Sequence, residues 1–290
     1  MRGGRAAARG MRWPDFRDLE GWRSLLRLLA GSAREQGADL LLLPGMLGLK
    51  LLDLGRPWSF GPELSRRVAE QAGLLEEGLA IAQEVAAEFE LYLAPGSFLL
   101  PAGNGGLRHE AVLFDPAGRE ILRTAQTHPS AREAAWGVRP GQTLELAPSP
   151  WGKIGLLVGN DAWVPEVGRI LALEGAELFL APVTRPAPYR EVEQLWGTWA
   201  QVQGNQTYAL ECGLWGRSGG ELWAHRTAAL APCELTPGET GFLVRDQEWA
   251  VADFPPQELA AVRRSYPLRR HLNLPLYRRH LPLFWREEHP

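Results

Sequence analysis

The sequence predicts a layered α/β domain in which helices cover β-sheets on their outer faces. Two observations predict this fold class. Helical and strand-like apolar patterns alternate along most of the chain, and several strand-like segments then follow one another. The 290 residues are 45% hydrophobic and 22% charged, an ordinary globular composition that is ample for one large layered core.

Helices are predicted where apolar residues recur with a helical period. Residues 22–36 place leucine and alanine on one face, and Gly37 supplies a C-terminal stop. Residues 62–88 form a second helical region that we expect to divide near Gly73. Pro165 followed by Glu166 is typical of a helix start, and residues 255–265 form the last predicted helix.

Strands are predicted where short apolar runs lack a helical period. Residues 40–43 are four leucines, a pattern typical of a strand covered on both faces. Residues 4–11 would form the first strand, but they show little of the apolar alternation that a buried strand needs. The other predicted strands are 91–100, 111–114, 120–124, 154–158, 177–181, 208–214, 222–230, 241–244 and 249–252, with a turn at 115–118.

Composition excludes several classes of function. The formal net charge is −3 and the pI is about 6.1, so no electrostatic field for nucleic acid or membrane binding is indicated. No run of ~18 apolar residues predicts a spanning helix, and the N-terminal region lacks the apolar core of a secretory signal. We therefore expect a cytoplasmic protein in which Cys212 and Cys233 are free thiols, and we expect no cofactor and no metal.

Three segments carry the strongest functional signal. Residues 153–169 read KIGLLVGNDAWVPEVGR, residues 40–46 read LLLLPGM, and residues 121–128 read ILRTAQTH. They resemble the nucleophile, general-base and lysine motifs of the carbon–nitrogen hydrolase (nitrilase/amidase) superfamily. By this resemblance the family's cysteine position is Gly159, its glutamate position is Gly45 and its lysine position is Gln126. The chain thus resembles a hydrolase whose three catalytic positions are emptied.

The resemblance covers nearly the whole chain. Further family-like segments are residues 37–45, 111–122, 138–142, 173–183, 199–210 and 258–277. Within 199–210 the sequence departs from the family at Gln201 and Gly204. The resemblance implies one domain over residues 1–290 with a four-layer αββα sandwich of the nitrilase type. It also implies a homodimer of the form αββα–αββα, with residues 267–290 as a tail that packs on the domain or on its partner.

The three substitutions bear directly on the chemistry of the family. Its acyl transfer uses a thiolate nucleophile, a carboxylate base and a cation that stabilises the developing anion. Glycine supplies neither a nucleophile nor a base, and the amide of Gln126 carries no charge. We therefore expect a catalytically inactive homologue.

The remaining candidates for a ligand-binding site lie beside the emptied positions. By the resemblance, Glu133 matches the family's second glutamate, and without the lysine it needs another partner or is protonated. Asn160 and Asp161 follow Gly159, and their backbone N–H groups form the remnant of an anion hole. We take Gln126, Glu133, Asn160 and Asp161 as the ligand-binding candidates.

Other residues have structural interpretations. Glu166 and Arg169 are expected to pair at a helix start, and His128 is expected to be structural. Cys212 lies mid-strand with no histidine nearby in the sequence, which makes it a poor candidate for a relocated nucleophile. The core or interface tryptophans, of which one or two could fill space at the old triad, are Trp58, Trp136, Trp163, Trp196 and Trp199.

The sequence leaves three functions open, and the lining of the pocket at the emptied positions discriminates between them. The first is a non-catalytic homologue that binds a small ligand, regulates or serves as a scaffold, and an open polar pocket would favour binding. The second is a working amide hydrolase that uses Glu133 with relocated groups, which a new acid–base pair would favour. The third is a purely structural partner protein, which a pocket filled by aromatic side chains would favour.

Overall fold

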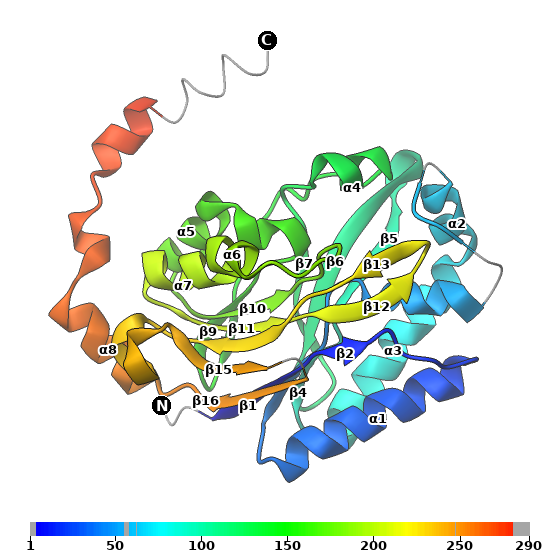
Figure 1. Cartoon of the computed structure of the whole chain (residues 1–290), viewed down its shortest axis with the longest axis horizontal. Helices are drawn as coiled ribbons and strands as arrows, with labels where there is room; N and C mark the ends of the chain where they lie inside the picture. The colour runs from blue at the N-terminus through cyan, green and yellow to red at the C-terminus, as the bar shows by residue number, and fades with distance from the viewer. Residues whose placement is uncertain (1–3, 55–57, 62, 247, 281–290) are drawn as a thin grey trace.

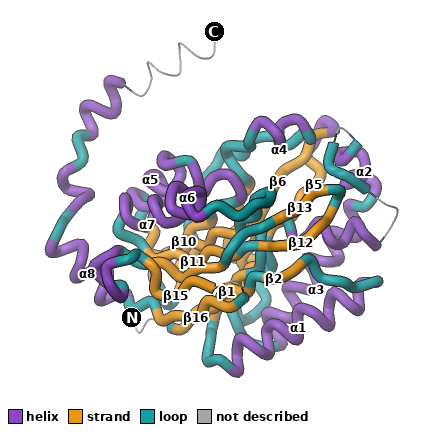
Figure 2. Tube along the Cα trace, in the orientation of Figure 1, coloured by secondary structure: helices purple, strands orange, loops and turns teal. Residues whose placement is uncertain are grey.

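A computed structural model describes residues 4–54, 58–61, 63–246 and 248–280. Two β-sheets pack face to face, and helices cover the outer face of each sheet (Figure 1). The four-layer αββα sandwich implied by the sequence is therefore confirmed. The tube in Figure 2 shows the strands of both sheets gathered in the centre, with helices on either side.

The larger sheet contains seven strands within the described residues. Its order is β16 (Trp249–Asp253), β1 (Arg5–Arg9), β3 (Leu40–Leu42), β4 (Tyr92–Ala94), β6 (Gly106–Phe114) and β5 (Ser97–Ala102), and β7 (Glu120–Ala125) also pairs with β6. Strands β1, β3 and β4 are parallel, whereas β4, β5 and β7 each run antiparallel to β6.

The second sheet contains six strands in the part of the chain that the structure describes. Its order is β15 (Phe242–Asp246), β14 (Thr227–Leu230), β11 (Tyr208–Cys212), β10 (Ala176–Pro182), β9 (Gly152–Leu156) and β8 (Ala147–Ser149). A small sheet joins β13 (Glu221–Trp223), β12 (Leu214–Ser218) and β2 (Met11–Arg12).

The α-helices form the two outer layers and the connections. They are α1 (Leu19–Glu35), α2 (Leu64–Glu70), α3 (Ala72–Glu88), α4 (Ala131–Ala135), α5 (Pro165–Leu173), α6 (Glu191–Gln194), α7 (Ala200–Asn205) and α8 (Pro256–Ser265). Helices α1 and α3 pack together on the larger sheet, and α5 and α7 pack together on the second sheet. A 3₁₀ helix, η1 (Leu47–Leu54), follows β3, and a π-type turn, η4 (Leu195–Trp199), leads into α7.

Three apolar layers hold the sandwich together. The first lies between α1, α3 and the larger sheet, and it includes Trp22, Leu26 and Leu41. The middle layer, between the two sheets, contains Leu42 and Leu180, and the third lies under α5 and α7. Because successive strand residues point to opposite faces, the leucines of β3 serve two layers at once, as the all-leucine run predicted.

The predicted first strand does form, although its sequence shows little apolar alternation. Ala6, Ala7 and Ala8 are fully buried in β1, which lies between β16 and β3. Small side chains suit this place because β1 is covered on both faces by packed layers.

Several predicted boundaries are corrected by backbone geometry. The single strand predicted over 91–100 is two strands, because Pro95 and Gly96, which has φ of +91°, turn the chain between β4 and β5. The strands predicted over 208–214 and 222–230 are also each divided, into β11 and β12 and into β13 and β14. The helical region after residue 62 divides at Gln71 rather than at Gly73. Helix α1 begins earlier than predicted, because Asp18 caps it by accepting a hydrogen bond from the Gly21 N–H.

The C-terminal part of the chain leaves the body after α8. The 3₁₀ turn η7 (Leu268–His271) and residues up to 280 extend along one side of the molecule (Figure 1). The rest of the predicted tail, residues 281–290, lies outside the described residues. Among the described helices, none is both long and apolar enough to cross a membrane.

Candidate functional site

Gly159, the predicted nucleophile position, opens the 3₁₀ helix η3 (Gly159–Trp163) beyond the end of β9. Its φ is +52°, a left-handed conformation that suits glycine. A Cβ atom here would lie 2.6 Å from Cε1 and 2.9 Å from Nδ1 of His109, and 3.1 Å from Nε2 of Gln126. The imidazole of His109 therefore occupies the space into which a side chain at position 159 would project.

His109, on β6, is held by hydrogen bonds at both ring nitrogens. Nε2 lies 2.6 Å from Oγ of Ser97, which in turn accepts a hydrogen bond from the Met46 N–H. Nδ1 lies 3.0 Å from Oε1 of Gln126 and 3.3 Å from Oε1 of Glu133. Because those two oxygens only accept hydrogen bonds here, the network assigns a proton to Nδ1.

Gln126, the predicted lysine position, is fully buried at the end of β7. Its side-chain oxygen faces His109, and its Nε2 donates to Oε2 of Glu133 at 3.1 Å. The side-chain amide thus bridges two members of the network. No part of it lines the cavity described below.

Glu133 is buried and belongs to a capping box at the start of α4. Its Oε2 accepts from the N–H and Oγ of Ser130, and Ser130 Oγ accepts from the Glu133 N–H. Burial opposes ionisation of the carboxyl group, but hydrogen bonds from His109 and Ser130 and the charge of His109 together lower the pKa of Glu133 below its usual value. The predicted need for another partner is met by His109 and Ser130.

Gly45, the predicted base position, lies where β3 ends against the end of β10. A Cβ atom at Gly45 would lie 2.7 Å from the carbonyl oxygen of Pro182 and 2.9 Å from the carbonyl carbon of Val183. The Gly45 carbonyl accepts a hydrogen bond from Oγ1 of Thr184 at 2.7 Å. Backbone rather than movable side chain therefore fills the space beside this glycine.

Asn160 and Asp161 hold a neighbouring loop. Asp161 is fully buried and accepts hydrogen bonds from the N–H groups of Thr127 and His128, both at 2.8 Å. Burial raises the pKa of its carboxyl group, although these hydrogen bonds oppose the shift. Asn160 Nδ2 donates to the His128 carbonyl at 3.0 Å. Of the two, only Asn160 lines the cavity.

A cavity of about 60 Å³ remains beside these residues. His109, Glu133 and Asn160 are among the residues that line it. Three tryptophans form much of the remaining wall: Trp136, Trp163 and Trp223. Trp136 and Trp163 thus fill space near the predicted triad, whereas Trp196 is 67% exposed.

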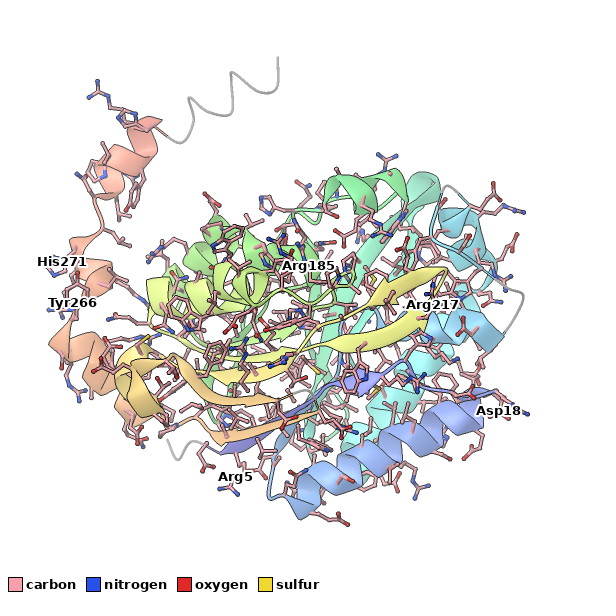
Figure 3. The ribbon with its side chains drawn as sticks, in the orientation of Figure 1. Arg5, Asp18, Arg185, Arg217, Tyr266 and His271 are labelled. Atoms are coloured by element: carbon pink, nitrogen blue, oxygen red, sulfur yellow. The ribbon has the colours of Figure 1, made fainter. Side chains whose placement is uncertain are left out.

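Two arginines stack on these tryptophans at the edge of the cavity. The guanidinium of Arg185, labelled near the middle of Figure 3, lies 4.4 Å from the ring centre of Trp163. The guanidinium of Arg132 lies 5.3 Å from the ring centre of Trp136 and forms an ion pair with Glu221. Stacked cations and aromatic rings therefore form part of the cavity wall.

The other sequence-based candidates lie outside this network. Cys212 is fully buried in β11, and burial raises its thiol pKa well above the usual value, which disfavours the thiolate. The predicted ion pair of Glu166 with Arg169 is wrong, because Arg169 donates instead to the Gly204 carbonyl at 2.7 Å. No cluster of three or more acidic, histidine or cysteine side chains suited to a metal occurs within the described residues.

Sequence reasoning missed His109 and Ser97. A signal for His109 exists in the strand period, because His109 shares the face of β6 that carries Leu107, Ala111 and Leu113, all fully buried. A polar residue on a buried face needs hydrogen-bond partners. The Ser130–Glu133 spacing likewise matches a capping box and could have placed Glu133 on a helix start.

Comparison with known proteins agrees with this fold. Residues 5–224 match the family model described as carbon-nitrogen hydrolase. The omega-amidase NIT2-B of Xenopus laevis is 22% identical over 86% of this chain and 88% of its own length. A hydrolase of Schizosaccharomyces pombe is 21% identical over 91% of this chain and 81% of its own.

Solved structures give the same result. The crystal structure of an amidase from Nesterenkonia sp. matches with a TM-score of 0.71 at 22% identity, covering 92% of this chain and 98% of that chain. A variant of that amidase in complex with butyramide matches with the same TM-score and identity, over 93% and 98% of the two chains. This likeness shows the nitrilase-type fold. Since the family model spans most of the sequence, the chain belongs to the carbon-nitrogen hydrolase family.

Proposed function

We propose that this chain is a catalytically inactive carbon-nitrogen hydrolase homologue whose role is structural or regulatory. One observation carries the proposal. The side chain of His109 fills the space in front of Gly159, where the family's nucleophile would project. The conformation of Gly159 and the backbone contact at Gly45 support it, because neither position has room for a larger side chain.

The rival hydrolase function would need His109 and Glu133 to act as an acid–base pair. Both ring nitrogens of His109 already have protein partners, and the ring turns its Cε1 toward Gly159. Oε2 of Glu133 already accepts hydrogen bonds from Ser130 and Gln126. Proton transfer to a substrate would break this buried network, so the geometry favours a structural role for the pair.

Ligand binding in the old pocket is also disfavoured by size. Small-molecule pockets usually measure ~300–1,000 Å³, and a water needs roughly 10–15 Å³ of such volume. The cavity of about 60 Å³ accommodates a few waters only. We therefore favour a function exerted through protein contacts.

The activity test uses short amides, nitriles and N-carbamoyl amino acids as substrates. We expect no turnover above background for the wild-type protein, and no change on replacing Cys212 by alanine. Turnover that disappears in Glu133→Ala would establish a relocated acid–base pair. Turnover that survives Glu133→Ala but disappears in Cys212→Ala would identify a relocated thiol. Either result would overturn the proposal.

We also propose that the chain forms a homodimer through the outer face of α5. Ile170 and Leu173, three residues apart on α5, are each 47% exposed. Exposed apolar side chains gathered on one face favour burial against a partner.

Light scattering tests the dimer directly. We expect twice the monomer mass of 32.1 kDa at micromolar concentration. The double variant Ile170→Ser/Leu173→Ser should shift the mass toward the monomer. Leu28→Ser is the matched control, because Leu28 is also exposed, at 66%, but lies on α1 in the opposite layer. A wild-type monomer, or equal effects of the two variants, would contradict this interface.

A further inference from the structure

Arg169, on α5 beside α7, has an unusual environment. Its Nη2 donates to the Gly204 carbonyl, but its Nη1 is buried and has no hydrogen-bond partner among the described residues. No described carboxylate lies within ion-pair distance, although Glu166 is one turn away on the same helix. A buried donor without an acceptor destabilises the protein, so the site favours an added acceptor.

Space for such an acceptor lies next to Arg169. A pocket of about 260 Å³ is lined by Arg169, Gly204 and Asn205, with Trp196 and Tyr277 as aromatic walls. A Cβ atom at Gly204 would meet only Arg169 Nη2, at 4.0 Å. Helix α7 therefore leaves space beside the guanidinium at Gly204.

Asn205 provides a second, independent observation at the same pocket. The residue is only 3% exposed, and its Nδ2 donates to the Gln201 carbonyl at 2.9 Å. Its Oδ1 has no hydrogen-bond partner within the described part of the chain. The pocket thus combines a donor that lacks an acceptor with an acceptor that lacks a donor.

The local charge favours an anion. Three guanidinium groups, of Arg169, Arg263 and Arg269, lie near the start of the C-terminal tail, whose beginning is marked by Tyr266 in Figure 3. Burial and the charge of Arg269 lower the pKa of Arg263 to about 10, and burial and the charge of Arg169 lower the pKa of Arg269. Glu177 is the carboxylate that pairs with Arg263. With Glu166 on the rim, the cluster retains a net positive charge.

We infer that this pocket binds an organic carboxylate that also carries a neighbouring O–H or N–H donor and an apolar body. The carboxylate would pair with Arg169, the donor would satisfy Oδ1 of Asn205, and the apolar body would lie between Trp196 and Tyr277. The same carboxylate chemistry can come from a free small molecule or from an acidic side chain of a second copy of the chain. The inference does not depend on the inactive site, since the two sites share no residue.

Mandelate is the probe, because it has the carboxylate, the hydroxyl donor and an aromatic body. Mandelamide lacks the charge and phenylacetate lacks the hydroxyl group. Titration calorimetry and thermal unfolding should show binding of mandelate to the wild-type protein, with phenylacetate and mandelamide each at least about tenfold weaker. Arg169→Gln should lose this binding.

Gly204→Asp gives a second variant for the same test. The introduced carboxylate would face Arg169 from within the chain, so this variant should also lose mandelate binding while remaining folded. Gly204→Ala is the matched control, because it adds a side chain without charge and should keep at least part of the binding. If both charge variants lose mandelate binding, misfolding of one variant cannot explain the loss.

The outcomes separate the two sources of the carboxylate. Mandelate binding that both charge variants lose identifies a free ligand. Absence of mandelate binding, together with a dimer that Arg169→Gln and Gly204→Asp both weaken in sedimentation velocity, identifies an acidic side chain of the second copy. The inference would be overturned by equal binding of mandelate and mandelamide, or by unchanged mandelate binding in Arg169→Gln. It would also be overturned if mandelate did not bind and neither charge variant weakened the dimer.

Discussion

Replacing Gly159 by alanine tests whether His109 fills the nucleophile position. Two separate costs are expected. The left-handed φ of +52° costs a residue with a Cβ atom about 1–2 kcal/mol. The new Cβ atom would also lie 2.6 Å from Cε1 of His109, a contact that real structures avoid, and overpacking of this kind costs about 1–3 kcal/mol. The free energy of unfolding should therefore fall by roughly 2–5 kcal/mol.

A matched glycine separates the two costs. Gly238 has φ of +62°, and a Cβ atom there would meet nothing closer than Cγ2 of Thr240 at 3.9 Å. Gly238→Ala should therefore lose only the conformational part, about 1–2 kcal/mol. The difference between the two variants, measured by urea unfolding, gives the steric part at Gly159.

A double-mutant cycle then identifies the residue responsible. His109→Ala removes the imidazole and should itself destabilise the fold, because Ser97, Gln126 and Glu133 lose a partner. In that background Gly159→Ala should lose its steric part, so the double variant should be about 1–3 kcal/mol more stable than the sum of the single changes predicts. Additive effects, or equal costs at Gly159 and Gly238, would refute the reasoning.

Three further changes test other parts of the site and its surroundings. Gly204→Ala should raise the free energy of unfolding by about 0.5–1 kcal/mol, because Gly204 is helical with open space around its Cα; a lower midpoint in urea would contradict this. Ser130→Ala should cost about 1 kcal/mol by removing the cap of α4, and a circular dichroism melt measures it; an unchanged melt would contradict the capping box. Glu133→Gln should weaken the dependence of the free energy of unfolding on pH in the acid range. Because folding lowers the pKa of Glu133, its carboxylate contributes stability that is complete above its unfolded pKa of roughly 4.3 and is lost as pH falls through the folded pKa. An unchanged dependence between about pH 2 and 6 would argue against an ionised Glu133.

Whether the three predicted catalytic positions can accept catalytic side chains is a separate experimental question. A triple variant with Gly45→Glu, Gln126→Lys and Gly159→Cys would test whether the sequence positions can be refilled. The backbone of Pro182 and Val183 beside Gly45, and His109 beside Gly159, lead us to expect an unstable protein. A folded variant whose new thiol at position 159 alkylates faster than Cys212 would show that the pocket can reopen.

Much of the fold follows from local pattern. The leucines of β3, the helix that stops at Gly37 and the Pro165 start of α5 are set by periodicity and by backbone preferences of single residues. These signals failed at β1, where alanines form a buried strand. Alanine has little strand preference by itself, so only the packing of β1 between two layers places it in the sheet.

The sequence by itself determined the frame of this protein: its layers and the positions where a related hydrolase would carry catalytic groups. The tertiary structure decided what fills those positions. His109 lies on β6 and Gly159 follows β9, fifty residues apart, and no local pattern relates the direction of one side chain to the space beside the other. The contact exists because the two sheets pack face to face and bring the ends of these strands together. Which side chain fills the space beside Gly159 is therefore set by the packing of the two sheets, and the sequence of neither segment alone predicts it.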